Sequence, residues 1–273
     1  MNVRLPLRPR EAHSAVKYDS FMLQPSLFPL RITHKYPPDP IGTDIAFRCE
    51  AGSHGTFYAK DDSSGRPVRA TEFVATKFAE NVKIAVADCA VLEDENGETF
   101  FGSQSHISTA ENFVLNGHLR TPKKNELGEP DGWLGMYLSG LYVLDMFLSN
   151  DDRWTGNFVL TRDGFTDTLR AIDFGASRLK DISSNRFPVA ESRTVRDGRI
   201  LRKIHTFSLP AAHEMIDRIA AVPESVIDSI FSQLPEDWVS DEHKGWFRGV
   251  WVSGVRKIRL SALRAGLNDE SLL

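Results

Sequence analysis

The tripeptide Asp173-Phe174-Gly175 is the clearest chemical signal in the chain. It directly follows Leu169 to Ile172, a short run that reads as a β-strand. An aspartate fixed at the end of a strand is suited to hold magnesium against nucleotide phosphates, as phosphoryl transfer requires. Because Asp-Phe-Gly is also an acceptable turn sequence, a plain turn is the alternative. We interpret Asp173 as a metal ligand.

A second motif, Asp152-Arg153-Trp154-Thr155-Gly156-Asn157, lies upstream. Its spacing is that of a catalytic loop in which Asp152 orients the acceptor hydroxyl and Asn157 binds a second magnesium ion. The order of elements carries this interpretation, since an apolar helix precedes the motif and a pair of strands leads from it to Asp173. A solvated loop, or Asp151 as the catalytic residue, is the alternative.

A cation and a carboxylate in the first half of the chain would complete the pattern. Lys60 ends a strand-like run and Glu72 opens the helix that follows, so Lys60 would bind nucleotide phosphates while Glu72 holds it. A surface lysine and a charge at a helix N-terminus are the plain alternatives. A glycine-bearing turn before Lys60 would cover the phosphates with backbone N–H groups. Its predicted nucleotide-binding residues are Gly52, Ser53 and Gly55.

The elements that must position these residues divide the chain into two parts. Residues 1–103 predict an N-terminal lobe made of a small antiparallel sheet and one helix, with a strand exit at Gly102-Ser103. Residues 1–42, rich in Pro and Arg, predict an irregular arm or a short edge element. The predicted elements are a hairpin over 44–60, a helix around Val74, Phe78 and Val82, and strands over 87–92 and 98–101.

Residues 104–273 predict a mostly helical C-terminal lobe that contains the catalytic and metal-binding loops. The apolar run 133–148 predicts a buried helix, because it includes Asp145 and is shorter than the ~20 residues that span a bilayer. Two short strands, 158–160 and 169–172, flank a turn in this lobe.

Two basic segments lie in the last third of the chain. Arg193, Arg196, Arg199, Arg202 and Lys203 surround Asp197-Gly198, which reads as a hairpin turn. We interpret this segment as a solvated face, with a dock for an anionic partner or substrate as the alternative. The second segment, Arg256-Lys257-Arg259 with Arg264, predicts an amphipathic terminal helix.

The composition excludes several classes of protein. The 273 residues are 41% hydrophobic and 26% charged, which is typical of globular proteins, and the net charge of −4 argues against a protein built to bind nucleic acid. Cys49 and Cys89 are too few for a disulfide framework or a zinc cluster, which favours a reducing compartment. No apolar signal-peptide core follows the N-terminal arginines, so we expect a cytoplasmic protein with no membrane partner.

The chain resembles the HipA-like kinases, which are distantly related to phosphatidylinositol kinases. The resemblance spans roughly residues 45–177 and rests on Asp152 to Asn157, Ile172 to Gly175, the pairing of Lys60 with Glu72, and the strand exit at Phe101-Gly102-Ser103. It implies an α+β, bilobed protein-kinase-like fold with ATP and Mg²⁺ as cofactors. It also implies that Asp152 is catalytic, that Asn157 and Asp173 bind magnesium, and that Lys60 binds phosphate.

The resemblance further implies what the chain acts on. HipA-like proteins are typically Ser/Thr kinases that serve as bacterial toxins or growth regulators, often restrained by a partner encoded beside them. A protein substrate and an inhibitory partner protein are therefore expected. Ser53 would be a convenient autophosphorylation site, although a turn serine is the default interpretation.

The sequence also departs from related kinases at the catalytic loop. Asn150-Asp151 stand where protein kinases carry His-Arg, and Trp154 stands where phosphatidylinositol kinases carry a His. The identity of the phosphate acceptor is therefore undecided. Three alternatives to a protein kinase are a small-molecule or lipid kinase, a nucleotide-binding pseudokinase that acts as an interaction module, and a nucleotidyl transferase.

Overall fold

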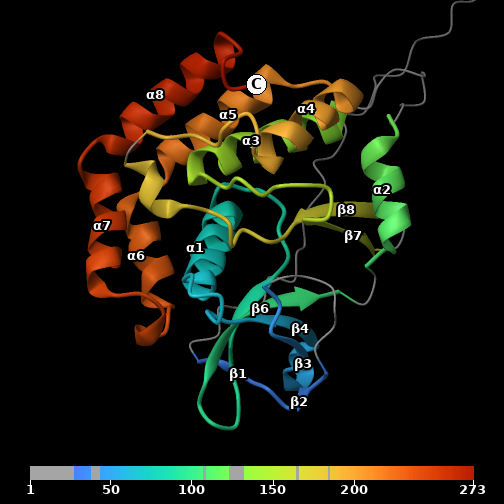
Figure 1. The fold of residues 1–273 in the computed structure, drawn as a ribbon, viewed down its shortest axis with the longest axis vertical. Helices are drawn as coiled ribbons and strands as arrows, with labels where there is room; N and C mark the ends of the chain where they lie inside the picture. Colours follow the sequence, from blue (N-terminus) through green and yellow to red (C-terminus); the bar gives the residue numbers. More distant parts are fainter. Residues whose placement is uncertain (1–27, 38–43, 107–108, 123–131, 164–165, 184) are drawn as a thin grey trace, which may run out of the picture.

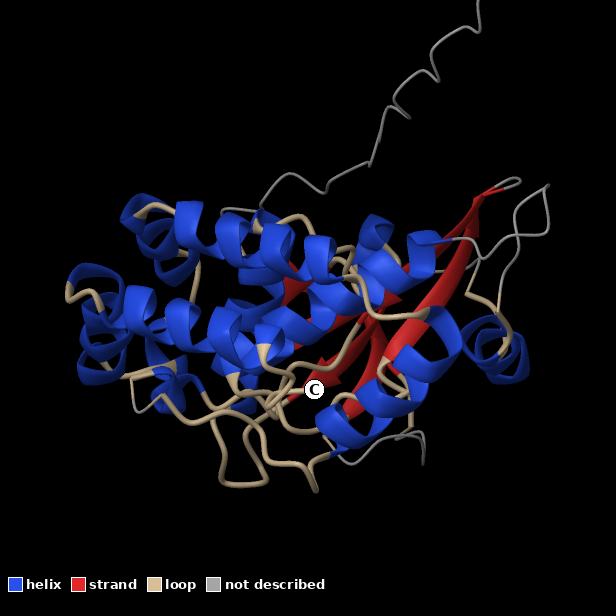
Figure 2. Ribbon diagram, turned by 90° about the horizontal axis from the view of Figure 1, so that it is seen from above, coloured by secondary structure: helices blue, strands red, loops and turns tan. Residues whose placement is uncertain are grey.

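A six-stranded sheet forms one lobe of the molecule and a group of helices forms the other (Figure 1). The computed structural model describes residues 28–37, 44–106, 109–122, 132–163, 166–183 and 185–273. Seen from above, the helices cover most of the strands (Figure 2). Most of the predicted arm lies outside the described residues.

The sheet has the strand order β1-β5-β6-β4-β3-β2, and its pairs are antiparallel except for β1 with β5. The predicted hairpin is present as β3 and β4, and the predicted edge element as β1 and β2. β6 continues to Ser105, beyond the predicted exit at Gly102-Ser103. The strands are β1 (Leu30–Arg31), β2 (His34–Lys35), β3 (Phe47–Glu50), β4 (Thr56–Lys60), β5 (Cys89–Glu93) and β6 (Thr99–Ser105).

Helix α1 (Val68–Asn81) lies between the sheet and the helical lobe (Figure 1). Its predicted apolar stripe of Val74, Phe78 and Val82 is buried, as a helix facing a core requires. The prediction that Glu72 opens the helix is wrong: Glu72 lies in the second turn, and the first turn carries no acidic residue. Stabilisation of the helix N-terminus therefore does not account for Glu72, which is 1% exposed.

The C-terminal lobe is built around α3, the predicted buried helix. The strands β7 (Phe158–Asp163) and β8 (Thr166–Ala171) form the predicted second hairpin. Among the described residues, no helix is both long and apolar enough to cross a membrane. The helices are α2 (Asn112–Arg120), α3 (Gly132–Leu148), α4 (Arg193–His205), α5 (Leu209–Ala221), α6 (Glu224–Ser232), α7 (Asp241–Val252) and α8 (Val255–Asn268), with short 3-10 turns at Gly52–His54, Leu179–Ile182 and Glu236–Trp238.

The prediction of a hairpin turn at Asp197-Gly198 is wrong, because both residues lie inside α4. Ser192 caps this helix by accepting a hydrogen bond from the backbone N–H of Val195. Gly198 allows α4 to pack closely against α3, because a Cβ atom at this position would lie 2.9 Å from the ring of Tyr142. An Asp-Gly pair signals a turn only when the surrounding chain does not bury the glycine against a neighbour.

The C-terminal helices hold α1 in place, a role that the sequence did not indicate. Phe78 of α1 packs against Phe147 and Trp251, with ring centroids 5.9 and 5.5 Å away. Phe73 meets Trp238 at 6.3 Å, and the Trp238 indole N–H donates to Thr99 Oγ1 of the sheet at 2.8 Å. One hydrophobic core therefore runs through both lobes, and α1 is fixed from both sides.

Arg259 links the predicted terminal helix α8 to the end of α3. The side chain is 1% exposed and donates hydrogen bonds to the carbonyl oxygens of Met146 and Phe147 and to Ser149 Oγ. These carbonyls end a helix and have no partner within it, so the guanidinium satisfies them. Burial lowers the pKa of Arg259 to about 10.

Candidate functional site

Lys60 stands where the two lobes meet and is held by one carboxylate from each. Its Nζ atom lies 2.5 Å from Glu72 Oε1 of α1 and 2.8 Å from Asp173 Oδ1, in the segment after β8. The second oxygen of Glu72 accepts the backbone N–H of Phe174 at 2.9 Å. The predicted pairing of Lys60 with Glu72 is present, and it reaches the predicted metal ligand directly.

The two carboxylates respond differently to the same ammonium group. Burial raises the pKa of Glu72 to about 7, although Lys60 opposes this. Burial also acts to raise the pKa of Asp173, but Lys60 lowers it further, to about 2. The side chain of Asp173 is 40% exposed and that of Glu72 only 1%, which explains the difference. Burial acts to lower the pKa of Lys60, but the two carboxylates raise it above its ordinary value.

Asp152 and Asn157 lie together on the loop between α3 and β7. The Asn157 side-chain N–H donates to the Asp152 carbonyl oxygen at 2.8 Å, and its backbone carbonyl accepts from Ile172 N at 3.1 Å. Asn157 is therefore fixed beside the chain that leads into Asp173. The Asp152 carboxylate takes no part in these bonds, and its side chain is 43% exposed.

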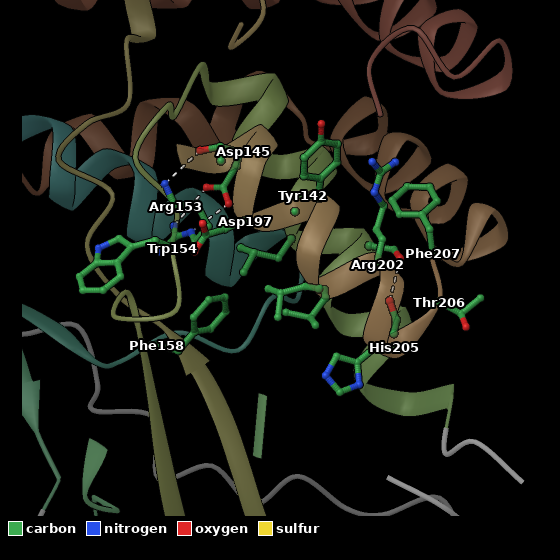
Figure 3. A pocket seen from close by; sticks show the side chains of 17 residues that line it. Tyr142, Asp145, Arg153, Trp154, Phe158, Asp197, Arg202, His205, Thr206 and Phe207 are labelled. Carbon is green, nitrogen blue, oxygen red and sulfur yellow. Dashed lines mark hydrogen bonds and ion pairs between the residues drawn. The ribbon is translucent and has the colours of Figure 1, made fainter. Parts of the chain in front are cut away.

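Arg153, to which the sequence assigned no role, holds this loop from inside. Its guanidinium bonds both oxygens of Asp145 at 2.9 and 3.1 Å (Figure 3). It also donates to the carbonyl oxygens of Asn157 and Ile172. It also lies 4.3 Å from the centroid of the buried Phe174 ring. The available signal was Asp145, a single carboxylate within an apolar helix, because a fully buried carboxylate requires a cation.

The first two turns of α4 hold the same loop from the other side. The buried Thr194 side chain donates to the Asn150 carbonyl at 2.6 Å and accepts the Arg153 N–H at 3.0 Å. Asp197 accepts the Thr155 N–H at 3.3 Å. The catalytic-loop candidates therefore depend on α4, which the sequence did not identify as a helix.

Arg193 brings a cation to the Asp152 carboxylate. Their side chains form an ion pair at 3.0 Å, and the guanidinium lies 5.6 Å from the centroid of the Trp154 ring. Burial raises the pKa of Asp152, while Arg193 acts to lower it. Trp154 in turn lies against Gly156, where a Cβ atom would come within 2.3 Å of the indole ring. This glycine leaves room for the tryptophan ring beside Asp152.

The predicted phosphate-covering turn lies at the tip of the β3–β4 hairpin. Gly52, Ser53 and Gly55 are exposed, and both glycines have positive φ, which suits a residue without Cβ. Thr33 Oγ1 accepts the Gly52 N–H at 3.2 Å, and Gln104 donates to the His54 carbonyl at 2.7 Å. Within the described residues, no hydrogen bond or ion pair joins this tip to Lys60 or Asp173.

The donor set fits a magnesium ion that shares phosphate oxygens. The described residues contain no group of three His, Cys, Asp or Glu side chains that would hold a metal alone. Mg²⁺ in nucleotide sites typically takes one or two protein oxygens and completes its shell with phosphate and water. Asp173 offers a partly exposed carboxylate, and Asn157 Oδ1 accepts no hydrogen bond within the described residues.

A cavity between α3 and α4 borders the catalytic loop on the side away from Asp173. Its wall includes Tyr142, Asp145, Arg153, Trp154 and Asp197 (Figure 3). The volume of about 30 Å³ suits roughly one water molecule, so a nucleotide does not fit there. The candidate nucleotide site is instead the group of charged side chains around Lys60.

Comparison with known proteins supports the fold. No protein-family model and no curated protein matches the sequence. Among solved structures, the chain is similar to the Helicobacter pylori proinflammatory kinase CtkA, with a TM-score of 0.56 and 13% identity over 87% of this chain and 97% of that chain. The predicted bilobed, kinase-like fold is confirmed.

HipA of the Shewanella oneidensis toxin–antitoxin system, solved with HipB and operator DNA, also aligns with the chain. The TM-score is 0.44 with 8% identity over 90% of this chain and 70% of that chain. The likeness to the CtkA structure is what confirms the predicted relation, at the level of the fold.

We predict that Asp145→Asn destabilises the protein by about 3 kcal/mol or more, because the buried Arg153 loses its counter-ion. Denaturant unfolding would measure the loss. Asp167→Asn is the matched control: its partner Arg162 is 61% exposed, and such pairs are worth about 0–1 kcal/mol. Equal stability of the two variants would contradict the role given to Arg153.

Proposed function

We propose that this chain is a kinase that transfers the γ-phosphoryl group of ATP to a Ser or Thr hydroxyl of a protein. The observation that carries the proposal is the Lys60 ammonium held between Glu72 and Asp173. This arrangement joins a strand lysine, a helix glutamate and the Asp of an Asp-Phe-Gly segment, which are the parts that kinases use to bind ATP and metal. Asp152 and Asn157 add the aspartate and asparagine of a kinase catalytic loop, and they precede Asp173 in the chain as in kinases.

The residues divide the work of the reaction. Lys60 leaves the exposed Asp173, keeps the buried Glu72, and binds nucleotide phosphate. Asp173 and Asn157 would hold Mg²⁺, which would neutralise charge on the phosphates. Asp152 orients the acceptor hydroxyl and takes its proton as the oxygen forms a bond to the γ-phosphorus and the bond from that phosphorus to the β–γ bridging oxygen breaks, which releases ADP.

The protein acceptor and the biological setting rest on the resemblance to HipA-like kinases. On that basis we propose a cytoplasmic kinase that acts as the toxin or regulator of a bacterial toxin–antitoxin or defence system, restrained by a partner protein. Autophosphorylation of Ser53, which is exposed at the hairpin tip, belongs to the same proposal. The presence of Asp152, Asn157 and Asp173 speaks against a pseudokinase.

The test is transfer of label from γ-labelled ATP with Mg²⁺, for the purified protein alone and with cell lysate. We expect labelled protein that disappears with Asp173→Ala, and a loss of at least ~10²-fold in rate with Asp152→Asn. Asp151→Asn is the matched control on the same loop and should stay active. α-Labelled ATP detects nucleotidyl transfer. Nucleotide binding without label on any protein would refute the protein-kinase assignment.

We also predict that Arg193→Gln moves the acid limb of the pH–rate profile to higher pH. Asp152 works as the ionised base, so the rate falls as pH drops through its pKa, which burial raises and Arg193 lowers. Without the Arg193 cation, burial raises the pKa of Asp152 with less opposition. Profiles of kcat/KM between acid and neutral pH would measure the shift. Arg196→Gln, one turn along α4, should leave the limb where it is, and superimposable wild-type and Arg193→Gln profiles would disprove the link.

A further inference from the structure

The outer side of α4 is cationic along its whole length. Arg193, Arg196 and Lys203 are exposed there, together with Ile200, and we call the three cations the basic face of α4. The opposite side of the helix is buried through Thr194, Val195, Leu201 and His205. The helix therefore places these cations together on one exposed side, which a hairpin turn would not do.

The charge of this face is not balanced within the described structure. Arg196 and Lys203 form no ion pair with any described residue, and Arg193 pairs only with Asp152. The single acidic residue of α4, Asp197, accepts a hydrogen bond from Thr155 N and so faces the catalytic loop. A local positive surface thus stands on a chain whose net charge is −4.

The basic face begins at the candidate catalytic residue. Arg193 lies 3.0 Å from Asp152, and the Trp154 ring beside it is 42% exposed. A Ser or Thr hydroxyl that reaches Asp152 sits on a short side chain, so the substrate backbone must pass close to Arg193 and Trp154. The next residues of the substrate then have α4 as a neighbouring surface.

We propose that the basic face of α4 binds an acidic segment of the protein substrate beside the acceptor hydroxyl, an inference that rests on the proposed function. A helix rises ~1.5 Å per residue, which places Arg196 about 4.5 Å and Lys203 about 15 Å from Arg193 along α4. An extended peptide rises ~3.3 Å per residue. The face therefore matches acidic side chains about one to two and about four to five residues from the acceptor.

The character of the face favours a peptide over a nucleic acid. Ile200, which is 56% exposed, interrupts the cations with an apolar side chain, and the indole of Trp154 adds an aromatic surface at the end near Asp152. Phosphate backbones are bound by broad fields of cations, whereas alternating charged and apolar contacts suit the side chains of a peptide. Complementary charge chiefly speeds encounter and discriminates between ligands, so its loss should slow association of the acidic peptide and thereby raise its Kd, while an uncharged peptide is unaffected.

The test measures binding before catalysis. A fluorescein-labelled Ser peptide with Glu on both sides of the serine is compared with one in which Gln replaces every Glu, by anisotropy without ATP. We expect Arg196→Glu with Lys203→Glu to weaken binding of the Glu peptide by about tenfold or more and to leave the Gln peptide unchanged. The matched control, Arg31→Glu with Lys257→Glu, reverses two exposed charges elsewhere and should bind the Glu peptide like the wild type.

Phosphorylation of the same peptides separates the inference from the proposed function. We expect the double α4 variant to raise KM for the Glu peptide while kcat and KM for ATP stay unchanged. Phosphorylation of both peptides with equal KM would support the kinase function and overturn the acidic-segment proposal. An oligonucleotide of equal charge that binds the basic face of α4 as tightly as the Glu peptide would also overturn that proposal. Charge-dependent peptide binding without phosphorylation would support peptide binding by the basic face of α4 and refute the proposed kinase function.

Discussion

The contact of Lys60 with Glu72 and Asp173 is the interaction on which the rest of the structure depends. Lys60 and Glu72 are neighbours within the N-terminal lobe, whereas Asp173 lies 113 residues from Lys60, so the contact with Asp173 forms only when the two lobes are packed together. The aromatic contacts of Phe78 with Trp251 hold α1 at the position from which Glu72 reaches the lysine. The C-terminal helices thus serve the site without contributing a side chain to Lys60.

The charges of this cluster explain why it would accept a metal and a nucleotide together. One ammonium and two carboxylates leave a negative excess, which favours a cation, while Lys60 itself favours phosphate. The two carboxylates differ in exposure: Glu72 is enclosed with the lysine, whereas Asp173 is partly open. In the proposed mechanism, Asp173 is therefore the partner that would exchange the lysine for Mg²⁺. On the acceptor side, Arg193 plays the corresponding part at Asp152, because it lowers a pKa that burial raises.

The sequence predicted the parts of the site that local order determines. Asp173 after a strand and Lys60 at the end of another were identifiable because strand ends have local signals. The pairing with Glu72 was expected because a phosphate-binding lysine needs a helix carboxylate, although the predicted position of Glu72 within its helix was wrong. Contacts that depend on distant packing were not identifiable. Arg153 binds Asp145 across the loop. Gly198 lies inside α4, where the absence of a Cβ atom lets the helix pack against Tyr142, and the Asp-Gly pair alone does not reveal this packing.

Calorimetric titration with ATP, in the presence and absence of Mg²⁺, tests the central claim most directly. The wild-type protein and Asp173→Asn would be compared, since the amide keeps the size of the side chain and removes its charge. The account predicts that Mg²⁺ tightens ATP binding to the wild type and has little effect on the variant. ATP affinity that does not depend on Mg²⁺ in the wild type, or that responds to Mg²⁺ equally in both proteins, would contradict the assignment of Lys60, Glu72 and Asp173 as the nucleotide and metal site.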